Sequence, residues 1–294
     1  DGSIYLWGAD TTARPEKGIP NRIVFSRDEG KTWVKTAAPI DYMVRLDVHD
    51  DGTLAVEGRY LPSGGLREGE HWFLLNASPE IRAQIESFPA LHPREPRHSP
   101  IAAVVLTNGD LDHTLGLLSL RESHPLVIYA TERVRTGFTE GNVLNRTLQR
   151  FPGQVTWKTL ILGQPAELAG IDGKPSGLVV EAIATPGKPP VHLEGLAPTD
   201  AGENIGLSIL DRNTKRRLAY FSAAGGITAA MRAAMDAADC VFFDGTFWLA
   251  DELITLGLGT KRAEDMAHVP VGGAGGSLEA LANMRAPRRV FIHI

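Results

Sequence analysis

One stretch of the sequence decides the fold, and it reads Val104-Val-Leu-Thr-Asn-Gly-Asp-Leu-Asp-His-Thr-Leu-Gly-Leu-Leu-Ser-Leu-Arg-Glu122. It begins with aliphatic residues typical of a buried strand, passes through a polar turn, and ends with leucines at helical spacing. In an α/β protein, side chains at the carboxyl end of a strand face the crevice in which ligands bind. The turn places Asp110, Asp112 and His113 there, and carboxylates and imidazoles are common metal ligands. We therefore expect a metal site in this turn, since capping the next helix would need only one such residue.

The composition is that of an ordinary globular protein, and it limits the classes of partner. The 294 residues are 43% hydrophobic and 22% charged, with a formal net charge of -5. The lack of a long basic run argues against nucleic acid, and no stretch approaches the ~18 consecutive apolar residues of a membrane span. A lone cysteine, Cys240, excludes an intrachain disulfide and a cysteine-cluster zinc site, which suits a reducing compartment. We therefore expect a cytoplasmic protein, and whether it forms a homodimer stays open.

Residues 1–65 differ in character from the rest of the chain. Short strand-like runs alternate with turns there, which is typical of a β-meander. The segment Ser26-x-Asp28-x-Gly30-x-Thr32-Trp33 resembles the Asp-box hairpin of sialidase-type propellers, which implies a structural hairpin lock. A single box cannot close a propeller, which needs several blades. We therefore expect residues 1–65 to form a β-hairpin appendage and residues 66–294 to form the main domain.

From residue 66 onward, strand-like and helix-like segments alternate, and this alternation predicts an α/β fold. The expected strands are 72–76, 101–107, 126–130, 155–162, 178–185, 205–211, 217–222, 240–244 and 290–294. Helices are expected over 114–121, 228–238 and 277–284, and another should begin at a capping Ser78 followed by proline.

Several candidate metal ligands and charged residues follow strand-like runs. They are Asn108, Asp110, Asp112, His113, Lys188, Asp244, His268 and His293. Their order resembles that of the metallo-β-lactamase superfamily, above all its ribonuclease Z branch. The superfamily signature His-x-His-x-Asp-His falls on residues 108–113, its Thr-Pro-Gly-His turn on 185–188, and its terminal histidine on His293. This resemblance implies the αββα sandwich of that superfamily, a four-layer α/β fold.

The departures from this pattern concern the first of the superfamily's two metal positions. Three histidines of the pattern are replaced, by Asn108, Asp110 and Lys188. Asp112, His113 and His293 match the residues of the second position. Two imidazoles and one carboxylate with open positions suit iron(II) as well as zinc, and the cationic Lys188 would repel a second metal. The resemblance therefore implies one divalent metal, held by Asp112, His113 and His293.

The remaining site residues receive supporting roles from the same resemblance. Asp110 either ligates the metal or holds His113 in one tautomer. Asp244 is a bridging or supporting acid, unless it merely forms an Asp-Gly turn. His268 matches the additional histidine of the ribonuclease Z branch, and Lys188 would hold a carboxylate of the substrate.

Further stretches narrow the resemblance to the B-protein family of pyrroloquinoline quinone (PQQ) biosynthesis. They include Leu74-Leu-Asn-Ala-Ser-Pro-Glu-Ile81, the turn 107–118, Phe242-Phe-Asp-Gly-Thr246 and Gly257-Leu-Gly-Thr-Lys261. The resemblance covers residues 71–294. Residues 1–65 have neither the glycine-rich first strand nor the zinc-binding cysteine cluster of that family, and the family continues beyond His293. We therefore expect residues 1–65 to be foreign to the family and the domain to be truncated at its C-terminus.

The resemblance implies a step in making PQQ from a precursor peptide that contains glutamate and tyrosine. The implied reaction is hydroxylation of the tyrosine ring, with iron(II) favoured over zinc, because oxidation by O2 needs a redox metal with open positions. Two alternatives stay open: a non-enzymatic carrier of PQQ or its precursor, and a hydrolase with a metal-activated water. The replaced histidines of the first metal position argue against the hydrolase.

Overall fold

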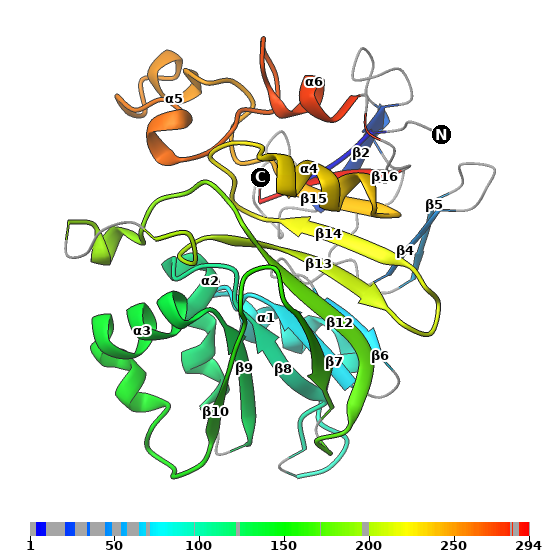
Figure 1. Cartoon of the computed structure of the whole chain (residues 1–294), viewed down its shortest axis with the longest axis vertical. Coiled ribbons are helices and arrows are strands. Elements are labelled where there is room, and N and C mark those ends of the chain that lie inside the picture. The colour runs from blue at the N-terminus through cyan, green and yellow to red at the C-terminus, as the bar shows by residue number, and fades with distance from the viewer. Residues whose placement is uncertain are drawn as a thin grey trace.

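The structure is a computed structural model that describes residues 71–96, 98–121, 124–170, 172–195, 200–282, 284 and 288–293, together with the backbone of six strands between residues 4 and 68. Two large β-sheets dominate it (Figure 1). The larger sheet has the order β11-β12-β13-β14-β15-β16-β1-β2-β3, and the smaller has the order β10-β9-β8-β7-β6. Strands β4 (Arg45–Val48) and β5 (Leu54–Glu57) pair as a separate hairpin.

The elements have the following bounds. The larger sheet contains β11 (Pro165–Ala169), β12 (Pro175–Ala184), β13 (Ile205–Asp211), β14 (Arg217–Phe221), β15 (Cys240–Asp244), β16 (Arg288–Ile292), β1 (Ile4–Ala9), β2 (Asn21–Ser26) and β3 (Val34–Lys35). The smaller contains β10 (Val155–Thr159), β9 (Leu126–Ala130), β8 (Ile101–Val105), β7 (His71–Leu75) and β6 (Gly65–Glu68). The α-helices are α1 (Ile81–Ser87), α2 (Leu111–Thr114), α3 (Glu132–Gly141), α4 (Ala229–Asp236), α5 (Glu252–Thr255) and α6 (Ser277–Ala282). The 3-10 helices are η1 (Pro89–Leu91), η2 (Leu115–Leu120), η3 (Val143–Thr147), η4 (Val191–Leu193) and η5 (Glu264–Met266).

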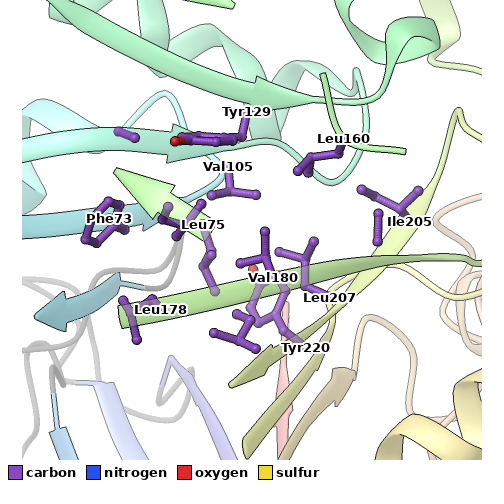
Figure 2. Packing of buried hydrophobic residues seen from close by; sticks show 14 of the residues in the cluster. Phe73, Leu75, Val105, Tyr129, Leu160, Leu178, Val180, Ile205, Leu207 and Tyr220 are labelled. Atoms are coloured by element: carbon purple, nitrogen blue, oxygen red, sulfur yellow. The ribbon is translucent and has the colours of Figure 1, made fainter. Parts of the chain in front are cut away.

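The main core lies between the two sheets, as Figure 2 shows. Alternate residues of a strand point to opposite faces, so β7 contributes Phe73 and Leu75 to this core. The facing sheet contributes Val180 from β12 and Leu207 from β13. All four side chains are at most 1% exposed, so the two sheets pack face to face with their apolar sides together.

Each sheet also has an apolar outer face that helices cover. The alternate residues of β7, Trp72 and Leu74, pack in a second core with α1, η2 and α3. On the other sheet, Phe291 of β16 packs in a third core with Met231 and Met235 of α4 and with α6. The order is therefore helices, sheet, sheet, helices, and the expected four-layer αββα arrangement is confirmed (Figure 1).

Two expectations about helices are wrong in detail. The segment 114–121 is not one α-helix: α2 ends at Thr114, whose φ of -125° departs from the α-helical value, and the 3-10 helix η2 follows. Ser78 does not cap α1, which begins at Ile81; its hydroxyl instead accepts a hydrogen bond from Gln84 at 2.7 Å. Elements that the sequence analysis did not predict include β11, α3 and α5.

Among the strands between residues 4 and 68, β1, β2 and β3 extend the larger sheet and β6 extends the smaller one, whereas β4 and β5 pair only with each other. β1 pairs in parallel with β16 and antiparallel with β2, and β6 pairs antiparallel with β7.

The turn of the Asp-box-like segment, residues 27–33, lies outside the described residues. The expectations that residues 1–65 are foreign to the family and that the domain is truncated stay predictions. Among the helices of the described chain, none is both long and apolar enough to cross a membrane.

Parallel pairing brings the carboxyl ends of several strands to one edge of the molecule. β7, β8 and β9 run parallel in the smaller sheet, and β14, β15 and β16 run parallel in the larger one. A backbone bridge between Asn108 and Asn204 ties the segment after β8 to the start of β13. The polar residues that follow β8, β15 and β16 therefore meet between the two sheets.

Candidate functional site

The structure brings the predicted metal ligands to one place. Asp112 and His113 lie on α2, which follows β8, and His293 follows β16 directly. Donor atoms of these three residues all lie within 4.8 Å of one another. A second group with the same spacing, Asp244, His268 and His293, shares the last histidine. The site thus contains two adjacent groups of donors.

His113 is held by Asn108, which stands where the superfamily pattern has a histidine. The His113 ring is buried, and its Nδ1 lies 2.7 Å from Asn108 Oδ1. Asn108 Nδ2 donates to Asn204 Oδ1 at 3.3 Å, so Asn108 Oδ1, which also accepts from Asp110 N at 3.1 Å, accepts the proton of His113 Nδ1. This hydrogen bond leaves the lone pair of Nε2 facing Asp112, whose Oδ2 is 3.9 Å away. Asn108 thus makes the hydrogen bond that was one of the two roles expected for Asp110, and the other role, ligating the metal, stays a prediction.

His293 is held in the same way from the larger sheet. Its backbone is in the left-handed region, with φ of 64°, which is uncommon for a residue other than glycine. Nδ1 lies 2.8 Å from Thr246 Oγ1, and the Thr246 hydroxyl donates to Asp244 Oδ1 at 2.6 Å. Thr246 therefore accepts the Nδ1 proton, and Nε2 faces Asp112 Oδ2 at 2.9 Å.

Asp244 is the buried support of the second group of donors. Its Oδ1 accepts hydrogen bonds from the Thr246 backbone and hydroxyl, and its Oδ2 accepts from Ala224 N at 2.9 Å and His268 Nδ1 at 2.6 Å. The side chain is fully buried, and both oxygens are engaged by the protein itself. Asp244 is therefore arranged to orient His268 and, through Thr246, His293.

The charges of the first group are strongly coupled. Burial alone would lower the pKa of His293, but hydrogen bonding and charge from Asp112 and Asp244 raise it to about 10. Burial would likewise raise the pKa of Asp112, but the hydrogen bond from His293 and the nearby His113 lower it to about 2. Burial lowers the pKa of His113 to about 4, so this ring is neutral at pH 7. A neutral imidazole and an ionised carboxylate are the forms that ligate metals.

Asp110 and Lys188 lie close to this group but differ in their partners. Burial, together with the charge of Asp112, raises the pKa of Asp110 to about 6, and the charges of His268, His293 and, least of all, Lys188 oppose that rise. The Lys188 ammonium pairs with Glu194 Oε1 at 2.9 Å, so its charge is already balanced by the protein. The prediction that Lys188 holds a substrate carboxylate stays a prediction.

The first group fits a divalent cation better than the second. Asp112 is half exposed, and hydrogen bonds at the far nitrogens turn Nε2 of His113 and His293 toward it. In the second group both oxygens of the buried Asp244 already accept hydrogen bonds from the protein, whereas in the first group a cation would replace only the 2.9 Å contact between His293 Nε2 and Asp112 Oδ2. We therefore retain Asp112, His113 and His293 as the predicted ligands, with Asp244 and His268 as supporting residues.

Two residues of the site were missed by the sequence analysis. Thr246 connects Asp244 to His293, and Asn204 orients the side chain of Asn108. A signal for Thr246 was present, because a threonine two residues after Asp244 can bond back to that carboxylate. No local pattern links Asn204 to Asn108, which are 96 residues apart in the chain.

The chain is similar to known proteins over most of its length. The model of the beta-lactamase superfamily domain matches residues 71–294. Coenzyme PQQ synthesis protein B of Bradyrhizobium diazoefficiens is 40% identical over 233 residues, which are 77% of this chain and 74% of that protein. The protein of the same name from Gluconacetobacter diazotrophicus is 42% identical with the same coverage. The crystal structure of Zn(2+)-bound PqqB from Methylobacterium extorquens is 38% identical, with a TM-score of 0.71 over 78% of this chain and 75% of that one.

Proposed function

Because this chain belongs to the coenzyme PQQ synthesis protein B family of the β-lactamase superfamily, we propose that it acts in PQQ synthesis as a metal-dependent oxygenase. A role in PQQ synthesis follows from the shared family. The substrate we propose is a small precursor peptide that contains glutamate and tyrosine, and the reaction is hydroxylation of the tyrosine ring. The metal we propose is iron(II), although the related structure from Methylobacterium extorquens holds zinc.

The observation that carries this proposal is the composition of the donor group. Asp112, His113 and His293 offer one carboxylate and two imidazoles, the set associated with iron(II) oxygenases that keep open coordination positions. The residues that would hold a second metal in a hydrolase are engaged otherwise: Asn108 bonds to His113 and Lys188 pairs with Glu194. This arrangement supports a single metal with room for O2 and substrate.

When bound, iron(II) would supply the redox chemistry that activates O2. Overall, a ring C–H becomes C–OH with one atom of O2, and the other atom leaves as water after an external reductant supplies two electrons and two protons are taken up. Asn108 and Thr246 keep protons on the Nδ1 atoms of His113 and His293, so that both Nε2 atoms face the cation. Asp110 lies on the same turn and would exchange protons with the substrate phenol.

The proposal is tested with the full chain loaded with iron(II) under anaerobic conditions. Addition of O2, ascorbate and the dipeptide Glu-Tyr should yield a product heavier by one oxygen atom, detected by mass spectrometry. His113→Ala should abolish the product, whereas His98→Ala, a histidine outside this group, should preserve it. Iron(II) bound at the expected stoichiometry without any hydroxylated dipeptide would refute the oxygenase proposal for this substrate. Tight binding of PQQ without turnover would identify a carrier, and ester cleavage with zinc would identify a hydrolase.

A further inference from the structure

A pocket of about 150 Å³ lies between α3 and η4, beside the turn of residues 108–113 that carries the predicted metal ligands Asp112 and His113. One wall is formed by Gly109, the residue between Asn108 and Asp110, where it contacts Pro190. Along α3, Leu193 of η4 fills the space next to Gly137 that a larger residue would need. These contacts make the pocket mostly apolar.

The pocket contains a buried carboxylate with one oxygen unsatisfied. Glu203 lines it and is 8% exposed. Its Oε1 pairs with the guanidinium of Arg133, but its Oε2 has no hydrogen-bond partner among the described residues. Leaving a buried charged oxygen without a partner costs more than a typical hydrogen bond contributes. Oε2 therefore marks the place where a ligand can donate a hydrogen bond.

The local charge favours a cationic ligand over an anionic one. Arg133 is already paired with Glu203, and Glu140, an exposed acid that also lines the pocket, adds a second negative charge. A carboxylate placed directly against Glu203 Oε2 would be repelled by both acids. An ammonium group would gain charge-assisted hydrogen bonds, which are about twice as strong as neutral ones.

The pocket is joined to the candidate metal site through the backbone. Glu203 directly precedes Asn204, which forms a bridge with Asn108, and Ile205 N donates to Thr107 O at 2.9 Å. The segment carrying Glu203 is thus fixed to the turn that carries Asp112. Gly109 lines the pocket and belongs to the same turn as Asp112. A short peptide anchored at Glu203 would therefore pass Gly109 on its way to the predicted metal ligands.

We propose that this pocket binds the amino-terminal ammonium group of the peptide substrate, with Glu203 as the specificity-determining residue. The identity of the peptide rests on the proposed function, but the preference for an ammonium group rests on the pocket itself. Glu203 accepts a hydrogen bond from that group through Oε2 while Oε1 keeps its ion pair with Arg133.

Binding without turnover tests this inference separately from the oxygenase reaction. The full chain is titrated anaerobically, by calorimetry, with Glu-Tyr and with its N-acetyl derivative, which carries no ammonium group. The wild type should bind the free amine at least ~10-fold more tightly. Glu203→Gln, which keeps the size of the side chain, should bind both peptides alike.

Two further variants separate binding from folding. Thr136→Phe should weaken binding of Glu-Tyr by filling the pocket while Glu203 stays in place. Glu132→Gln removes an exposed acid from the same helix, where it pairs with Arg135, and should keep the preference for the free amine. Equal binding of the two peptides by the wild type, no binding of either, or a preference that persists in Glu203→Gln would each overturn the inference. If the wild type prefers Glu-Tyr over its N-acetyl derivative but does not hydroxylate it, the proposed oxygenase function is refuted and the ammonium pocket stands.

Discussion

Asn108 accepts a hydrogen bond from the His113 ring at 2.7 Å, and this contact determines which ring nitrogen faces Asp112. Replacing Asn108 with alanine should remove that control and leave the ring free to turn or to change tautomer. Loss of a residue that orients a metal-bound histidine typically lowers metal affinity by about 10–100-fold. We expect Asn108→Ala to lower the affinity for zinc or iron(II) by at least ~10-fold, measured by competition with a chromophoric chelator.

The control for this prediction is Asn145→Ala. Asn145 is also a buried asparagine, but its amide donates to Thr139 O and it belongs to neither group of donors. The metal affinity of Asn145→Ala should equal that of the wild type. If Asn108→Ala binds metal as tightly as this control does, Asn108 has no role in orienting His113.

At the residue scale, the identities of the site residues could be predicted but their partners could not. Asp112 and His113 share a short motif, and His293 ends a strand-like run, so each is visible locally. The role of Asn108 depends on Asn204, and that of His293 depends on Thr246, which lies 47 residues away in the chain. Such contacts exist only after the sheets have formed.

At the element scale, Gly116 allows η2 to pack directly against the loop after β7. A Cβ at this position would lie 2.1 Å from the backbone oxygen of Ser78, and Gly116 N donates to Ala77 O at 2.9 Å. Gly116→Ala should therefore push η2 away from the loop after β7. Because the obstruction is backbone, we expect the free energy of unfolding to fall by about 3 kcal/mol, measured by urea denaturation.

Gly259→Ala is the matched control for Gly116→Ala. A Cβ at Gly259 would meet Leu253 at 3.6 Å, an ordinary contact. This variant should change the free energy of unfolding by less than about 1 kcal/mol. If the two variants have equal free energies of unfolding, the backbone around Gly116 can move to make room for a methyl group without loss of stability.

The strands were more predictable than the helices, for a physical reason. Buried strands such as β9 and β13 are rich in aliphatic residues, and their observed bounds equal the expected ones. α3 has a cap at Thr131 but contains Gly137 and Gly141, which weaken the helical pattern. Its glycines are explained by Leu193, which packs where their side chains would be, and that contact comes from a distant segment.

At the scale of the whole molecule, the candidate site holds the two sheets together. His293 and Asp112 are 181 residues apart in the chain and meet at 2.9 Å. In the metal-free protein this contact is an ion pair, since the pKa of His293 is raised to about 10 and that of Asp112 is lowered to about 2. The pair therefore links the turn after β8 to the end of β16, and its effect on stability should depend on pH.

The direction of that dependence follows from proton linkage. A histidine whose pKa is raised by folding contributes stability that is fully present below its unfolded pKa and is lost as the pH rises through the folded value. For His293 this loss should occur between about pH 6.5 and 10. Because water screens the half-exposed Asp112, we expect the loss in free energy of unfolding to be about 2 kcal/mol. Urea denaturation of metal-stripped protein at pH 7, 8.5 and 10 measures it.

Two histidine variants assign this loss to His293. His293→Gln keeps a hydrogen-bonding side chain that does not titrate, so its free energy of unfolding should decline less between pH 7 and 10 than that of the wild type. His92→Gln changes an exposed histidine whose ring contacts Glu86 O, and it should retain the wild-type decline. If His293→Gln and the wild type lose the same stability over this range, the ion pair does not join the sheets in solution. The two sheets would then be held together by the apolar core between them without help from the site.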